Sequence, residues 1–151
     1  MPDPLQGKPE RYVYRRVKPD ARDPLTGEVT SAAFTLRDDE KGLSVFYSDM
    51  QTARGVRDEE LAELIAKLGV TSDRKKKKSL TRYIEKLDQQ IKDGEWIVVK
   101  LPVAAFPTDH FTLGDPEQNG HLEVIGERGS FLTYADDWAE IAEIEPIDEA
   151  S

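Results

Sequence analysis

Five consecutive cationic side chains at residues 74–78 are the most concentrated chemical feature of this sequence. With one further arginine, the basic set is Arg74, Lys75, Lys76, Lys77, Lys78 and Arg82. Lysine on its flexible stem acts as a point charge, which contacts phosphate or carboxylate groups without reading a base. The run therefore predicts an acidic partner: a phosphate backbone, a membrane surface or the acidic end of this same chain. A solvated turn without any ligand is the alternative, because most charge runs are simply solvated.

Catalytic and metal-binding motifs give no comparable signal. The sequence has no cysteine, which excludes disulfides and thiol chemistry. It contains neither a G-x-S-x-G motif nor a phosphate-binding glycine loop. The two histidines, His110 and His121, have Asp109, Asp115 and Glu123 nearby, but without a recognised ligand spacing. We therefore expect no metal or other cofactor, and a histidine that begins a strand is usually a hydrogen-bonded structural residue.

A hairpin of two helices over about residues 58–93 is expected to position the basic run. Apolar residues recur at helical spacing in both helices: Leu61, Leu64, Ile65 and Leu68 in the first, and Leu80, Tyr83, Ile84, Leu87 and Ile91 in the second. Asp58 is the expected N-cap of the first helix and Gly69 its C-terminal stop, while Gly94 ends the second. Because cations oppose the helix dipole at an N-terminus, we expect the second helix to begin near Ser79, after the run.

Short alternating or β-branched runs predict strands on both sides of this hairpin. They cover residues 12–17, 31–36 and 43–47 before it, and 96–99, 111–113, 121–125 and 131–134 after it. A polar turn at 37–42 connects the second strand to the third. Residues 138–147 fit a short helix or a strand, because Trp138, Ile141 and Ile144 recur at every third position. These elements predict an α+β fold: a mostly antiparallel sheet with the helix hairpin packed on one face.

Length and composition favour a single soluble domain. A chain of 151 residues can bury a substantial core. We expect residues 1–10, with three prolines, to be a flexible lead-in, residues 11–135 to form the α+β domain, and residues 136–151 to be an acidic C-terminal segment. Neither a signal-peptide pattern nor an apolar stretch of about 20 residues occurs. A cytoplasmic protein without a membrane span is therefore expected.

Charge is distributed unevenly along the chain, whose formal net charge is −9. Residues 67–86 hold 8 basic and 2 acidic residues, whereas residues 87–151 hold 3 basic and 15 acidic ones. A nucleic-acid-binding domain is usually basic overall, so only the basic run could contact nucleic acid here. The acidic segment, which begins with Asp136, Asp137 and Trp138, is a candidate partner surface of opposite sign. The two surfaces together would also permit head-to-tail self-association.

The predicted hairpin resembles a helix-turn-helix in part. Residues 61–71 are similar to the first helix and turn of bacterial regulators, and a basic helix and a strand follow them as in winged helices. One position departs from that pattern: the small residue usually found four positions before the turn glycine is Ile65. The resemblance implies a nucleic-acid-binding module that would use Arg74 and the four lysines.

A second set of motifs resembles a group of small bacterial proteins of unknown activity. The motifs are Tyr14-Arg15-Arg16, Ser31-Ala32-Ala33-Phe34, Ser44-Val45, Asp115-Pro116 and His121-Leu122-Glu123-Val124-Ile125-Gly126. This resemblance covers the first third of the chain and the region around His121. It leaves out the two helices, the lysine run and the acidic end, and it implies no particular activity.

The same region has a layout similar to that of ADP-ribosyltransferase-like and RES-type enzymes, which consume NAD. The residues concerned are Arg15, Arg16, Phe34, Ser44, Tyr47, His121 and Glu123. The resemblance implies an arginine on the NAD pyrophosphate, an aromatic ring on the nicotinamide, and Glu123 stabilising the ribosyl oxocarbenium ion. His121 would contact the ribose or act as an acid or base. All these residue types are common in β-sheet proteins, so the site requires that the fold bring them together.

Three functions follow as hypotheses. The one we favour is a small intracellular binding or accessory protein that acts through protein–protein contacts, either with a partner or with another copy of itself. Its surfaces would be the basic run and the acidic C-terminal segment. The alternatives are a helix-turn-helix-like nucleic-acid-binding module and an NAD-consuming enzyme. The uneven charge is the strongest single signal, and it favours the first.

Overall fold

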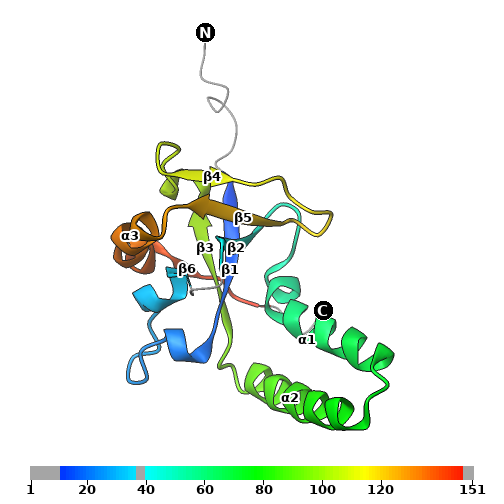
Figure 1. Cartoon of the computed structure of the whole chain (residues 1–151). Coiled ribbons are helices and arrows are strands. Elements are labelled where there is room, and N and C mark those ends of the chain that lie inside the picture. The colour runs from blue at the N-terminus through cyan, green and yellow to red at the C-terminus, as the bar shows by residue number, and fades with distance from the viewer. Residues whose placement is uncertain (1–10, 37–39, 148–151) are drawn as a thin grey trace.

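An antiparallel six-stranded sheet organises the computed structural model, which describes residues 11–36 and 40–147 (Figure 1). The strand order is β4-β5-β2-β1-β3-β6. The strands are β1 (Tyr12–Val17), β2 (Gly42–Tyr47), β3 (Ile97–Pro102), β4 (Phe111–Leu113), β5 (His121–Gly126) and β6 (Glu143–Ile144). The helices are α1 (Ala53–Val70), α2 (Arg74–Lys92) and α3 (Arg128–Ile141), with 3-10 turns at Pro19–Ala21, Ser31–Phe34 and Val103–Ala105. The predicted α+β class is confirmed.

The main core lies on one face of the sheet, called the core face below. Alternate strand residues point into it, as the two-residue period of a strand requires; Val13 and Val17 of β1 and Val45 of β2 are examples. The turn Ser31–Phe34 and helix α3 cover this face. Phe34, Phe106, Phe111, Phe131 and Trp138 form an aromatic cluster there, with ring centroids 5.0–6.2 Å apart. Aromatic clusters of this kind bury large apolar areas and dominate core stability.

The opposite face of the sheet, called the hairpin face below, is covered by the start of α1. Ala53 and Val56 of that helix pack on Phe46 of β2 and Val98 of β3. Helix α2 packs in turn on α1, through Leu87 and Ile91 against Leu61 and Leu64, with Trp96 closing the contact. Figure 1 shows the two helices side by side and pointing away from the sheet. The predicted hairpin is therefore present, and it is attached to the sheet through its base.

Both helices of the hairpin begin earlier than predicted. Thr52, not Asp58, caps α1, and its hydroxyl accepts a hydrogen bond from the Gly55 amide at 3.0 Å. The extra turns form because Ala53 and Val56 gain burial against the sheet. Helix α2 begins at Arg74 instead of near Ser79, because the Asp73 carboxylate accepts from two of the helix's first amides and offsets the dipole cost of the cations.

Of the two predicted helix ends, the one at Gly94 is confirmed and the one at Gly69 is wrong. Gly69 lies inside α1, which continues to Val70 and is closed by Thr71. Gly94 follows the end of α2 as expected, with φ of +74°, a conformation that glycine adopts without steric cost. The cationic run therefore forms the first turn of a helix that is complete to its N-terminus.

Two predicted strands are wrong, and residues 138–147 are partly helix and partly strand. Residues 31–34 form a 3-10 turn, and residues 131–134 lie within α3. The helix runs on to Ile141, and β6 follows at Glu143–Ile144. Phe131, Ala135 and Trp138 are buried on one face of α3, so helical spacing against the aromatic core prevails over the β propensity of the segment.

The proposed domain boundary after residue 135 is not where the fold ends. Residues 136–141 continue α3, and Trp138 is 1% exposed, so this stretch belongs to the domain. The expected lead-in at 1–10, part of the turn at 37–42 and the last residues, 148–151, lie outside the described residues. No helix in the described part of the chain is long and apolar enough to cross a membrane.

Candidate functional site

Ser44 and His121 meet on the hairpin face of the sheet. The strands β2 and β5 are neighbours, and their register places Phe46 opposite His121 and Ser44 opposite Glu123. The Ser44 hydroxyl lies 2.5 Å from Nε2 of His121, although 77 residues separate the two in sequence. The His121 ring also packs on Phe46, with centroids 5.2 Å apart. Two of the five predicted catalytic residues are therefore in direct contact.

Glu117, which the sequence analysis did not select, is the third member of this cluster. Its carboxylate lies 2.9 Å from Nδ1 of His121. A tight turn brings the two together: the Glu117 amide donates to the His121 carbonyl at 2.7 Å, and the His121 amide donates to the Asn119 side chain. Gly120 has φ of +87°, which allows the turn to close. The four-residue spacing around Asn-Gly was a usable signal.

The two arginines of β1 lie on opposite faces of the sheet. Arg15 points to the core face, where its guanidinium donates to the carbonyls of Ala33 and Ser44 at 2.5 and 2.7 Å. Arg16 points to the hairpin face, where it pairs with Glu60 at 3.4 Å and lies over the Trp96 ring. Only Arg16 shares the face of the Ser44 hydroxyl.

The remaining residues of the NAD-type layout are separated in the same way. Glu123 is on the hairpin face beside Ser44, and its side chain is exposed to solvent. Phe34 and Tyr47 belong to the cluster on the core face, so neither lies beside the Ser44 hydroxyl. The aromatic ring next to His121 is Phe46. The fold brings together Ser44, His121 and Glu123, and leaves Arg15 and both expected aromatic residues on the other face.

Carboxylates of α1 face the same site. The pKa of Glu59 is raised above its usual value, first by burial and then by its hydrogen bond with Glu63 and the charge of that residue. The charges of Arg16 and His121 act in the opposite direction on the same carboxyl group. The charges of Arg16 and His121 on the sheet thus both favour ionised Glu59 on α1, although burial and Glu63 outweigh them.

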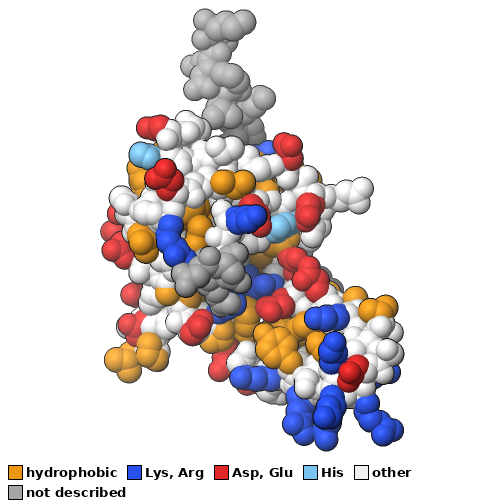
Figure 2. Space-filling view, in the orientation of Figure 1, with side chains coloured by type: hydrophobic (Ala, Val, Ile, Leu, Met, Phe, Trp, Pro, Cys, Tyr) orange, Lys and Arg blue, Asp and Glu red, His pale blue; other side chains and the backbone are white. Residues whose placement is uncertain are grey.

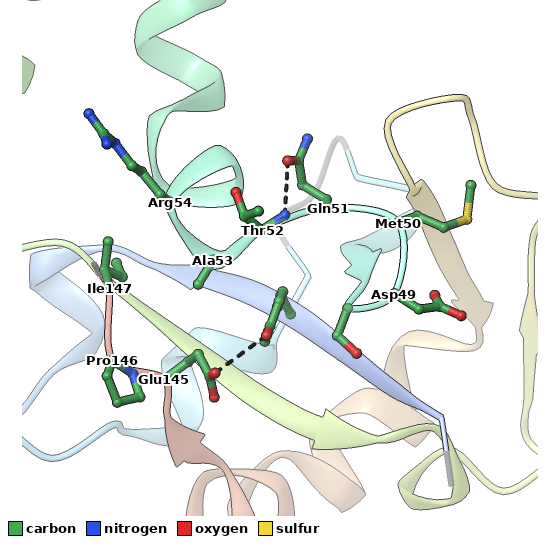
Figure 3. Close-up of a pocket in the computed structure, with 11 residues that line it drawn as sticks. Asp49, Met50, Gln51, Thr52, Ala53, Arg54, Glu145, Pro146 and Ile147 are labelled. Carbon is green, nitrogen blue, oxygen red and sulfur yellow. Dashed lines mark hydrogen bonds between the residues drawn. The ribbon is translucent and has the colours of Figure 1, made fainter. Parts of the chain in front are cut away.

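A separate groove of about 580 Å³ opens beside the base of α1 (Figure 3). The loop at residues 48–52 and the first two residues of α1 form one wall, and residues 145–147 form the other. On its floor the Tyr14 hydroxyl donates to the Glu145 carboxylate at 3.4 Å. Burial, together with the negative charge and hydrogen bond of Glu145, raises the pKa of Tyr14. A phenol and a carboxylate in this position can donate and accept hydrogen bonds to a small polar ligand.

The basic run occupies the far end of the hairpin. Arg74 and the four lysines are all exposed, and we call them the basic tip. Figure 2 shows Lys and Arg side chains gathered over this end of the molecule. Among the described residues, none of the five takes part in an ion pair. The acidic C-terminal segment does not fold back on the basic tip within the part of the chain that the structure describes.

Next to the basic tip the hairpin also exposes apolar side chains. Val70 at the end of α1 is 84% exposed, and Tyr83 of α2 is 47% exposed. A shallow groove of about 570 Å³ runs between Lys67, Lys75, Leu80 and Tyr83. Arg82, one of the predicted partner-binding residues, is exposed on the same helix. The end of the hairpin therefore offers positive charge and apolar contact area together.

The acidic surface lies on α3. Asp136, Asp137 and Glu140 are exposed on this helix beside exposed Leu132 and Ile141, and we call this set the acidic α3 surface. Figure 1 places α3 and the hairpin at different sides of the sheet. The third predicted residue of this surface, Trp138, is buried, and its indole nitrogen donates to the Ala105 carbonyl at 2.8 Å. Trp138 is therefore a core residue and is not available to a partner.

No family model, curated protein or solved structure matches the chain. Function is therefore inferred from geometry and charge alone. Any contact of the basic tip with nucleic acid would be a phosphate contact.

Proposed function

We propose that this protein is a binding protein that docks the basic tip of its hairpin onto an acidic, partly apolar protein surface, the acidic α3 surface of a second copy. The observation that supports it is an exposed cluster of five cations at the end of a projecting hairpin, none of which pairs with an acidic side chain within residues 11–36 and 40–147. Clustered like charges repel one another. An acidic partner would relieve this repulsion and would bring the two charged surfaces together.

The two surfaces match in more than charge. The tip combines lysines with Val70 and Tyr83, and the α3 surface combines carboxylates with Leu132 and Ile141. Exposed tyrosine and aliphatic side chains flanked by charged ones are a common composition for the centre and rim of a protein interface. Complementary charge would raise the association rate and set the orientation, while the apolar contacts would slow dissociation.

A protein surface suits the tip better than a nucleic acid does. Five consecutive cations within about one and a half helical turns form a compact cluster around the end of α2, whereas a duplex extends far past it and carries a charge about every 1.7 Å. The rest of the hairpin and the body carry Glu59, Glu60, Glu63 and the acidic α3 surface. A long polyanion would meet this negative charge, while a small acidic helix would not.

Mixing two complementary variants tests the proposal. The first replaces Lys75, Lys76, Lys77 and Lys78 by Gln, which removes four of the five charges of the basic tip. The second carries Asp136→Asn, Asp137→Asn and Glu140→Gln, which removes the acidic α3 surface. Sedimentation velocity at low ionic strength should show each variant alone as a monomer and their mixture as a dimer, because each keeps the half that the other lacks. The unaltered chain should form larger assemblies, since a head-to-tail contact does not close on itself in a dimer.

A matched control replaces the same four lysines by Arg and should associate as the unaltered chain does. Association should weaken as salt is added. A monomeric unaltered chain at all concentrations, or a mixture that stays monomeric, would overturn the proposal. So would binding of a DNA or RNA duplex that is lost in the Lys→Gln variant, which would make nucleic acid the partner.

A further inference from the structure

We propose that Ser44, His121 and Glu117 form an acyl-transfer site that hydrolyses small, activated esters. The hydroxyl of Ser44 lies 2.5 Å from Nε2 of His121, and Nδ1 of the same ring lies 2.9 Å from the Glu117 carboxylate. A nucleophile within hydrogen-bond reach of a base, with the base oriented by a third group, is the arrangement that activates a serine. This site is separate from the basic tip and from the acidic α3 surface.

The hydrogen-bond chain has one consistent direction. An ionised Glu117 carboxylate only accepts hydrogen bonds, so Nδ1 of His121 carries the proton in the neutral ring. Nε2 is then the acceptor, and the Ser44 hydroxyl donates to it. This is the protonation state that a general base requires before the reaction starts.

Neighbouring contacts hold the three groups in place. Phe46 packs on the His121 ring, and the turn closed by Gly120 holds the Glu117 carboxylate beside Nδ1 of that ring. From the core face, Arg15 donates to the Ser44 carbonyl at 2.7 Å. Positioning on strands and a tight turn is more rigid than positioning on a long loop. The site remains open to solvent, because the His121 side chain is 23% exposed.

The reaction would proceed in two balanced steps. Ser44 Oγ bonds to the acyl carbon while its proton passes to Nε2 of His121, and the ester bond breaks as the leaving oxygen takes that proton. Water then attacks the acyl carbon, gives its proton to His121, and the Ser44–acyl bond breaks as His121 returns the proton to Oγ.

The competing explanation is that the Ser44–His121 hydrogen bond only joins β2 to β5. Covalent labelling of the serine distinguishes a catalytic site from such a structural bond. A fluorophosphonate probe reacts covalently with an activated serine and not with an ordinary serine hydroxyl. The full chain should be labelled at Ser44, which peptide mass mapping identifies, and the label should vanish in Ser44→Ala. Ser48→Ala, a change in a serine just after β2, should keep it. An unlabelled chain, or a label on another serine, would overturn the proposal, and this result needs no variant to fold.

Hydrolysis of p-nitrophenyl acetate gives a second readout. His121→Gln should lower the rate by about 100-fold or more, the usual contribution of a general base. Glu117→Gln should lower the rate and also shift the pH at which it is half-maximal, because Glu117 acts through the His121 ring. Equal rates and an equal pH profile in both variants and the unaltered chain would overturn the proposal. Thermal melting checks that each variant is folded.

Discussion

The Tyr14 hydroxyl donates a hydrogen bond to the Glu145 carboxylate at 3.4 Å and so links β1 to the segment after β6 across 131 residues of sequence. Glu145 also lies 3.9 Å from Lys100 of β3, and its own amide donates to the Val98 carbonyl at 2.8 Å. These contacts attach the end of the described chain to the middle of the sheet. They belong to the fold and leave the acidic α3 surface free to face outward.

Replacing Tyr14 by Phe should lower the free energy of unfolding by about 0.5 kcal/mol at pH 7, the lower range for one hydrogen bond. The folded state raises the pKa of Tyr14, first through burial and then through Glu145. The stability from this raised pKa is complete below the unfolded value of about 10 and is lost as the pH rises through the folded value. Urea unfolding of both proteins at pH 7, 9 and 10.5 measures the difference. A Tyr14→Phe penalty that persists unchanged at the highest pH would contradict this assignment.

Replacing Asp73 by Ala should destabilise α2 by about 1 kcal/mol, the usual cost of losing an N-cap. The carboxylate accepts from the amides of Lys75 and Lys76 at 2.9 and 3.2 Å, and it also opposes the charge of the basic tip. Asp73→Asn keeps the cap and removes the charge, so its difference from the unaltered chain isolates the electrostatic part, and the difference between the two variants isolates the capping hydrogen bonds. Denaturant unfolding followed by circular dichroism measures both, with Ser72→Ala as the control. An unchanged free energy of unfolding in Asp73→Ala would show that the helical start of α2 at the basic tip does not depend on this cap.

Replacing Glu59 by Gln should stabilise the protein at neutral pH by about 0.2–0.5 kcal/mol, the cost of a like-charged pair one helical turn apart. Burial and Glu63 raise the pKa of Glu59, so its ionisation opposes folding. Because the folded state raises this pKa, the stability that protonated Glu59 contributes is complete at low pH and is lost as the pH rises through the folded pKa. The gain in melting temperature should therefore disappear near pH 4. A gain that is equal at pH 4 and pH 7 would point to another cause.

Replacing Trp138 by Ala should lower the free energy of unfolding by about 3–5 kcal/mol, because it leaves a large cavity in the aromatic cluster and an unused acceptor at Ala105. Truncation after Ala135 should unfold the domain for the same reason. Ile141→Ala, at an exposed position of the same helix, is the control and should change stability by less than about 0.5 kcal/mol. Circular dichroism and denaturant unfolding test these outcomes. A folded, cooperative truncated chain would show that α3 is dispensable.

Local periodicity was sufficient to predict the hairpin and most of the strands. An apolar face that repeats every 3.6 or 2 residues is a property of the segment itself, as in residues 12–17 and in the stripe through Leu87 and Ile91. The failures occurred where a segment's own propensity and its surroundings disagree. Residues 131–134 have β-forming side chains, yet they are helical because Phe131, Ala135 and Trp138 together fill the aromatic core.

In the candidate site too, the sequence indicated residue types, and the tertiary fold decided which of them meet. Ser44 and His121 were selected by type, but their contact depends on β2 and β5 being neighbours in one register, which no local pattern encodes. Arg15 and Arg16 were equivalent in the sequence, and the two-residue alternation of β1 placed them on opposite faces. Glu117 was missed because its role depends on a tight turn that folds it back onto the ring of His121.

The order of residues alone determined that this protein carries a compact positive run and a negative stretch over residues 87–151, since charge is a property of residues and needs no fold. The tertiary structure decided that the two remain apart. The hairpin packs on the sheet through its base, while α3 is held on the other face by its buried aromatic residues. Burial of apolar area outweighs attraction between solvated charges, so packing set the geometry and left both charged surfaces accessible.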